Sequence, residues 1–170
     1  MDAELGTDID RISNTGPMQV VRPPTRRLVD ETDLRVTSVH AEVLAKEIRG
    51  LLARQVAEAH CFIIFSVHDG DALVDRNRYV QTITFEGDRL LAESVGERYT
   101  VLEPEELREL ELFGWFAPDP DDPVGNFNAM WDPPDVDETA QMLALTLVRI
   151  HGLRSPEDLT IRVSETWEGE

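Results

Sequence analysis

Cysteine occurs only once in these 170 residues, at position 61, so no disulfide can form within the chain. A lone cysteine favours a reducing compartment, and we predict a cytoplasmic protein. No apolar run approaches the roughly 20 residues that span a bilayer. The first residues, MDAELGTDID, do not place a basic segment ahead of an apolar one. We therefore predict neither a membrane partner nor a secretory signal.

Basic residues are also scarce, with 16 lysines and arginines against 34 aspartates and glutamates, which gives a formal charge of −18. The excess is concentrated in residues 103–170, where seventeen acids face four bases. Such a chain repels phosphate groups, so nucleic acid and anionic lipid are poor partners. It attracts basic or cationic amphipathic protein segments. Acidity also simply keeps proteins in solution, and composition alone leaves both readings open.

The sequence contains none of the short motifs that signal common chemistry. There is no H-x-x-x-H, no C-x-x-C, no glycine-rich phosphate loop and no G-x-S-x-G elbow. The aspartates of DGDALVDRNRYV (69–80) superficially resemble a calcium loop. However, Leu73, Val74 and Val80 occupy the positions where such a loop needs an oxygen, a glycine and a glutamate. We expect no metal, no cofactor and no catalytic residue.

Four histidines are the remaining candidates for catalysis, and they lie far apart in the sequence. They are His40, His60, His68 and His151. Histidines with no partner at a metal-type spacing are usually structural or exposed. An enzyme of unknown type is therefore the minority reading. A buried group of histidines and carboxylates would revive it.

Residues 1–36 are predicted to be a disordered arm, because they show neither helical nor strand periodicity and contain three prolines. Within the arm, VVRPPTRR places Arg22, Arg26 and Arg27 around a proline pair. This segment is either a small docking motif or simply a soluble leader.

Order is predicted from residue 37 onward. Apolar residues at steps of three and four indicate amphipathic helices, and alternation indicates strands. We predict a helix at 37–59, strands at 61–68, 78–85 and 89–97, helices at 103–114 and 135–153, and a strand at 159–165. Short hairpin connections favour antiparallel pairing. The expected fold is a single α+β domain over residues 37–165, a twisted antiparallel sheet flanked by helices, followed by an acidic tail at 166–170.

The segment GWFAPDPDDPVGNFNAMW (114–131) combines aromatic rings, aspartates and three prolines, a spacing that suits neither helix nor strand. Its rings either plug one end of the sheet or rim a groove for a partner. Both are possible at once, with Trp115 and Phe127 inside and Phe116 and Trp131 at the edge. The candidate partner-binding residues are Trp115, Phe116, Asp119, Asp121, Asp122, Phe127 and Trp131.

Several of these stretches resemble a known group. The amphipathic first helix, NRYVQTITF, LLAESVG, LEPEELRELELFGW and GNF, followed by a closing helix and strand, are similar to the TY-Chap families, the peptide-binding domains related to type III secretion chaperones and YbjN proteins. The resemblance covers about residues 37–165. It implies a type III secretion chaperone-like α+β fold, binding of peptides or partner proteins, no catalytic residues, and frequent dimerisation.

We therefore expect a non-enzymatic binding protein that holds a basic or amphipathic segment of a client, with a homodimer as a further possibility. The alternative is an immunity or antitoxin-type inhibitor, whose acidic surface blocks one basic enzyme.

Overall fold

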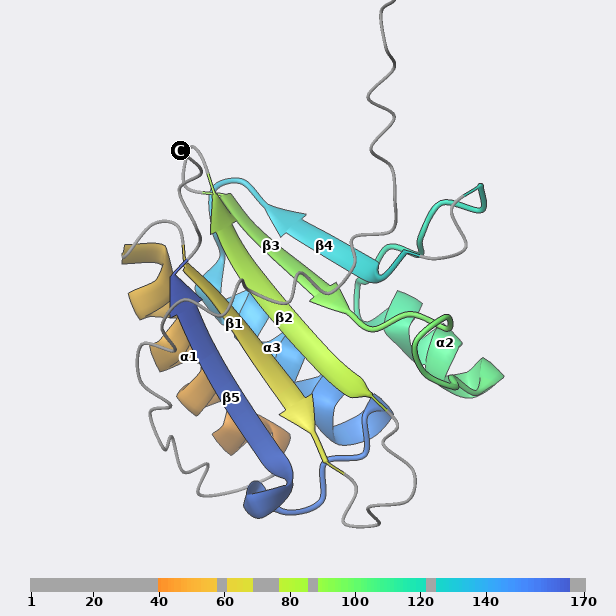
Figure 1. Cartoon of the computed structure of the whole chain (residues 1–170). Coiled ribbons are helices and arrows are strands. Elements are labelled where there is room, and N and C mark those ends of the chain that lie inside the picture. The colour runs from red at the N-terminus through yellow and green to blue at the C-terminus, as the bar shows by residue number, and fades with distance from the viewer. Residues whose placement is uncertain (1–39, 58–60, 69–76, 86–88, 122–124, 166–170) are drawn as a thin grey trace, which may run out of the picture.

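The computed structural model describes residues 40–57, 61–68, 77–85, 89–121 and 125–165. The predicted arm, the short connection expected between the strands at 78–85 and 89–97, and the acidic tail lie outside the described residues, as do His60 and Asp122. Within the described residues the chain forms one antiparallel five-stranded sheet with three α-helices (Figure 1). The predicted α+β class is confirmed.

The elements follow one another in the order α1, three strands, α2, β4, α3 and β5. Their bounds are α1 Ala41–Ala57, β1 Cys61–Val67, β2 Arg78–Phe85, β3 Arg89–Ser94, α2 Pro104–Leu112, β4 Phe127–Trp131, α3 Val136–Leu145 and β5 Leu159–Glu165. A π-helical turn, Thr146–Ile150, extends α3. A 3₁₀ turn, Pro156–Asp158, precedes the last strand.

The strands lie side by side in the order β4-β3-β2-β1-β5, and every neighbouring pair is antiparallel. The predicted three-strand meander is confirmed as β1, β2 and β3. The last strand returns to pair with β1, so β2 lies at the centre of the sheet.

Strand β4 corrects the sequence interpretation of residues 114–131 as an irregular segment. Phe127–Trp131 pairs with β3 along its whole length, and Phe116 forms an isolated antiparallel bridge with Asn128. The prolines at 118, 120 and 123 precede the strand and do not interrupt it. Five residues are too few for alternation to stand out, and the pairing partner is distant in the sequence.

Helices α1 and α3 pack together behind one face of the sheet (Figure 1). The core between them and the sheet holds alternate strand residues, such as Ile63 and Phe65 of β1 and Val80 of β2, against Leu44, Ile48 and Leu143 of the helices. Alternation along each strand thus sends one set of side chains into this core and the other set to the opposite face.

Local residue chemistry explains the ends of the helices. Asp135 caps α3 by accepting a hydrogen bond from the backbone of Glu138. Gly114 and Gly152 follow the two helical segments with φ of +100° and +74°, a backbone conformation that suits glycine. The first helix begins at Ala41, and the predicted start of this helix at residue 37 lies outside the described residues.

Candidate functional site

The face of the sheet opposite α1 and α3 is the candidate site, and we call it the open face. Among the described residues, no helix packs on it, and α2 lies beyond the end of β3 (Figure 1). Strand register places its side chains in cross-strand rows. One row is Asn128, Glu93, Gln81, Ile64 and Arg162, and the next is Met130, Leu91, Ile83, Phe62 and Ser164.

Phe116 extends the open face beyond β4. Its backbone N–H donates to the carbonyl of Asn128 at 2.8 Å and its own carbonyl accepts from Asn128 at 3.0 Å. Residues directly opposite each other in an antiparallel pair project to the same side. The Phe116 ring therefore lies on the open-face side, next to Asn128, and 68% of the residue is exposed.

Trp115 points the other way, as alternation requires. It is 3% exposed, and its indole N–H donates to the hydroxyl of Thr146 in the π-helical turn at 2.8 Å. Phe127 is 4% exposed and belongs to the same core. The structure thus buries Trp115 and Phe127 and exposes Phe116, which is the arrangement that the sequence analysis considered. The two buried rings anchor the segment and do not form its surface.

Trp131 lies between these extremes. It is half-buried against the core, at the end of β4. Its indole N–H donates to the carboxylate of Glu138 in α3 at 3.1 Å. Of the candidate aspartates, Asp119 and Asp121 are exposed, and Asp119 accepts a hydrogen bond from the backbone N–H of Asp121 at 2.9 Å. They follow Phe116 in the chain at the β4 edge of the sheet.

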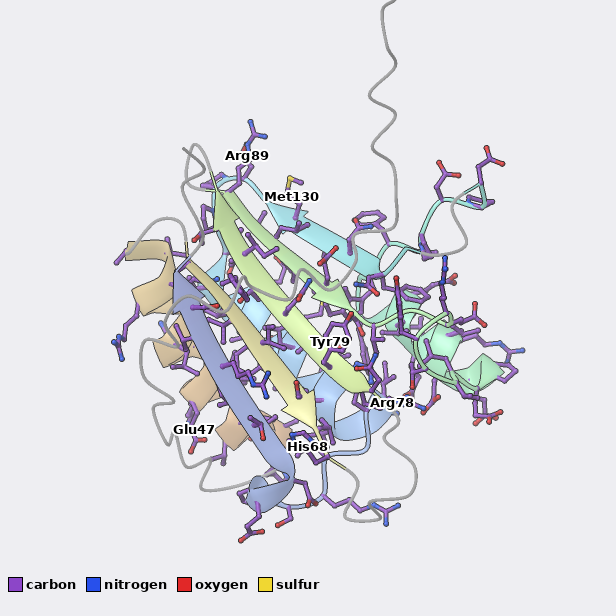
Figure 2. All side chains as sticks on the ribbon, in the orientation of Figure 1. Glu47, His68, Arg78, Tyr79, Arg89 and Met130 are labelled. Atoms are coloured by element: carbon purple, nitrogen blue, oxygen red, sulfur yellow. The ribbon has the colours of Figure 1, made fainter. Side chains whose placement is uncertain are left out.

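Met130 was absent from the sequence candidates, yet it lies on the open face of β4 and is 52% exposed (Figure 2). Its register partner Leu91 is half-buried, as is Ile83 one strand further on. Phe116, Met130 and Leu91 together give the open face an apolar margin along β4. A strand assignment for residues 127–131 would have found Met130, since its neighbours Ala129 and Trp131 face the core.

Glu93 was also overlooked. It lies in the middle of β3 on the open face, is 4% exposed, and accepts a hydrogen bond from the side-chain amide of Gln81 opposite it on β2. Burial raises the pKa of this carboxyl, an effect that the bond from Gln81 opposes. The available signal was a lone acid within the apolar strand LLAESV, where a carboxylate is costly to bury.

One end of the open face is closed by the loop after β3. Tyr79 is buried there, and its hydroxyl accepts a hydrogen bond from the amide of Asn126 at 3.2 Å. Burial raises the pKa of Tyr79 to about 12. Tyr99 packs against the cluster formed by Ile64, Tyr79 and Val95. This end of the face is therefore filled, and the β4 margin is where apolar atoms reach solvent.

The three histidines that the structure describes do not converge. His40 precedes α1, His68 is exposed with its ring 2.8 Å from the hydroxyl of Thr160, and His151 is buried against Ser94. Within the described residues, no group of three histidine, cysteine or acidic side chains is arranged to hold a metal ion. None of the described helices is long and apolar enough to cross a membrane.

Comparison with known proteins agrees with this geometry. Residues 41–165 match the family model described as TY-Chap3, T3SS (YopN, CesT) and YbjN peptide-binding chaperone 3. The match confirms the resemblance seen in the sequence, and its bounds coincide with the first residue of α1 and the last of β5. No curated protein and no solved structure matches the chain.

Proposed function

Because the chain belongs to the TY-Chap3 family of peptide-binding chaperone domains, we propose that it holds a basic or amphipathic segment of a client protein on its open face. In this proposal the protein acts in the cytoplasm, catalyses no reaction, and uses neither a cofactor nor a metal. The observation that carries this proposal is the pair of apolar side chains, Phe116 and Met130, that the open face presents to solvent beside the buried carboxylate of Glu93.

Apolar contact supplies the affinity in this proposal. Burying a whole phenylalanine or methionine side chain is worth about 1.5–3 kcal/mol, so covering the exposed parts of Phe116 and Met130 contributes about 1–2 kcal/mol each. Aromatic anchors on an otherwise polar rim are typical of binding surfaces. Methionine adapts to irregular apolar partners, which suits a protein with more than one client.

The acids supply selection by charge. Asp119 and Asp121 lie exposed just after Phe116, in the half of the chain where acids outnumber bases by seventeen to four. Their field attracts lysine- and arginine-bearing segments and repels acidic ones. A basic or cationic amphipathic segment is thus the occupant that fits both the apolar margin and its charge.

A direct test uses two fluorescein-labelled peptides of equal length, one alternating leucine with lysine and the other leucine with glutamate. Fluorescence anisotropy at low salt should show binding of the basic peptide and none of the acidic one. The full-chain variant Phe116→Thr with Met130→Thr should bind the basic peptide at least tenfold more weakly, because about 2 kcal/mol of apolar contact is lost.

The matched control replaces two apolar residues that are more exposed but lie elsewhere. Val101 and Leu112, before and at the end of α2, are 76% and 82% exposed. Val101→Thr with Leu112→Gln should leave binding unchanged. Equal loss in both double variants would mean nonspecific apolar adhesion and would refute the open face as the site.

Family membership does not favour the alternative of an inhibitor for one basic enzyme. The homodimer stays a prediction. Helix α1 or the outer edge of β5 would form its surface, and light scattering of the full chain measures the mass in solution.

A further inference from the structure

One cross-strand row of the open face is apolar over four neighbouring strands, and we call it the apolar row. Its side chains come in register from β4, β3, β2 and β1 and are Met130, Leu91, Ile83 and Phe62. Met130 is 52% exposed, and the other three keep intermediate exposure. Atoms of all four therefore reach solvent on the same side of the sheet.

Along any one strand, by contrast, the side chains on this face are mixed in polarity. Strand β3 presents Arg89, Leu91 and Glu93 to it in turn, and β4 presents Asn128 and then Met130. A bound segment that follows a strand therefore meets a charged or amide group beside each apolar one. A segment that crosses the strands on the apolar row meets apolar atoms throughout.

The spacing of the apolar row suits a helix better than an extended segment. Neighbouring strands lie about 4.8 Å apart, so the row is about 14 Å long. Side chains on one side of an α-helix recur about every 5.4 Å, so the residues at i, i+4, i+7 and i+11 cover this length. An extended segment places side chains of one face about 6.8 Å apart and sets only about three over the row. A helix thus puts one side chain over each strand.

The charges around the apolar row indicate the polar side of such a helix. The adjacent row carries the carboxylate of Glu93, and Asp119 and Asp121 lie exposed at the β4 margin. On the other side of the apolar row, Arg89 is paired with Asp132 at 3.3 Å, which offsets its charge. Lysines and arginines on the flanks of the helix complement these acids.

We infer that the client segment is a basic amphipathic helix of about twelve residues that lies across the strands, with its apolar stripe on the apolar row from Phe62 to Met130. The inference rests on the proposed function, because it gives the conformation and the direction of the segment that the open face holds. Phe116 lies one row away, beyond β4, where it can contact the last turn of the helix. Clients then share a helical spacing of apolar residues and need no common sequence.

Two fluorescein-labelled peptides of equal length and composition test the conformation. One is the peptide that alternates leucine with lysine, and the other repeats leucine–lysine–lysine–leucine, which gives leucine a helical period. In anisotropy at low salt, the helical-period peptide should bind the full chain at least tenfold more tightly, because about one more leucine packs on the apolar row. Proline at its centre should remove this advantage by breaking the helix. Equal or tighter binding of the alternating peptide overturns the inference.

A variant in the centre of the sheet tests whether the helix extends beyond β4. Ile83→Thr keeps a β-branched side chain in β2 and should weaken binding of the helical-period peptide about five- to tenfold. The control, Val43→Thr, makes the same kind of change in α1, on the opposite face of the sheet (Figure 1), at a residue that is 37% exposed. It should leave the affinity unchanged. Unchanged affinity in Ile83→Thr would confine the contact to β4 and refute the crossing.

A nitroxide attached to either end of the helical-period peptide reports its direction on the sheet. In the ¹⁵N-labelled chain, the label at one end should broaden the amide resonance of Met130 and the label at the other end that of Phe62, because these amides lie about 14 Å apart across the strands. If the peptide ran along a strand, the broadening would instead change between Arg89 and Ser94, the first and last residues of β3. That result overturns the inference.

The two proposals fail separately. If neither peptide binds, the client site itself is wrong. If the alternating peptide binds as tightly as the helical-period peptide, or the broadening follows β3, the open face remains the client site and only the crossing helix is refuted.

Discussion

The imidazole of His151 lies wholly inside the protein, between the end of the π-helical turn and β3. Its Nε2 is 3.0 Å from the hydroxyl of Ser94, and its Nδ1 has no hydrogen-bond partner. Burial, aided by the positive charge of Arg78, lowers the pKa of His151 to about 3. The group is therefore neutral in the folded protein at any physiological pH, which suits a structural residue better than a proton carrier.

This histidine makes stability depend on pH. The unfolded chain takes up a proton near pH 6.5, whereas the folded chain does not until about pH 3, so unfolding becomes easier as the pH falls below 6.5. When the pH falls from 7.5 to 5.0, protonation of this group in the unfolded chain should lower the free energy of unfolding by about 2 kcal/mol. Urea unfolding measures this loss of unfolding free energy between the two pH values. The loss should be smaller by that amount in the double variant His151→Leu with Ser94→Ala than in the unaltered protein. Ser94→Ala alone keeps the histidine and should keep the full loss; equal losses in all three proteins would contradict the assignment.

At the scale of the elements, Arg78 joins three parts of the chain at one end of the sheet (Figure 2). Its guanidinium donates to the carbonyl of Val101 at 2.6 Å, to the carbonyl of Ile150 at 3.0 Å, and to both carboxylate oxygens of Glu106 at 3.2 Å. Strand β2, helix α2 and the π-helical turn are thereby fixed relative to one another. Trp115, the residue before Phe116, is hydrogen-bonded to the same π-helical turn.

Replacing this arginine should loosen α2 and the segment that carries Phe116. Arg78→Met leaves a partly buried carboxylate and two carbonyls without their donor, which should cost about 3 kcal/mol in urea unfolding. Arg78→Lys should recover only part, because an ammonium cannot reproduce the planar fork. As a control, Arg49→Met removes an ion pair with Asp137 in which both side chains are more than half exposed, and it should cost at most about 1 kcal/mol. Similar costs at positions 78 and 49 would show that Arg78 does not hold these elements together.

Local sequence signals located most of these elements and the meander of β1, β2 and β3, but not the places of β4 and β5 in the sheet. Helical periodicity and alternation located α1, α2, α3 and four of the strands, because each is long enough to show its period. Strand β4 was not predicted, because its pairing with β3 depends on contacts across about thirty residues of chain. The same gap hid Met130, whose facing follows from the pairing of β4. Glu93 lies in a strand that was predicted, and it was overlooked as a lone acid there. Trp115 and Phe116 were correctly expected inside and at the edge, respectively.

For the molecule as a whole, the charge of −18 acts on stability and on binding in opposite directions. The surface ion pairs among the described residues, such as Arg49 with Asp137 and Arg89 with Asp132, are exposed and contribute little. Mutual repulsion of the acids therefore dominates the electrostatics of the folded chain. In the proposed function, the same acids attract a basic segment of the client.

Salt should consequently stabilise the fold while weakening the complex. Raising NaCl from 10 to 300 mM shortens the screening length from about 30 Å to about 6 Å. Calorimetry should show a rise in the thermal midpoint, because repulsion is screened, and anisotropy should show weaker binding of the leucine–lysine peptide, because attraction is screened. If the peptide binds equally well at high salt, the apolar margin at Phe116 and Met130 is sufficient for binding without the charge of the acids. A midpoint that falls with salt would instead mean that ion pairs, and not repulsion among the acids, govern the charge balance of this protein.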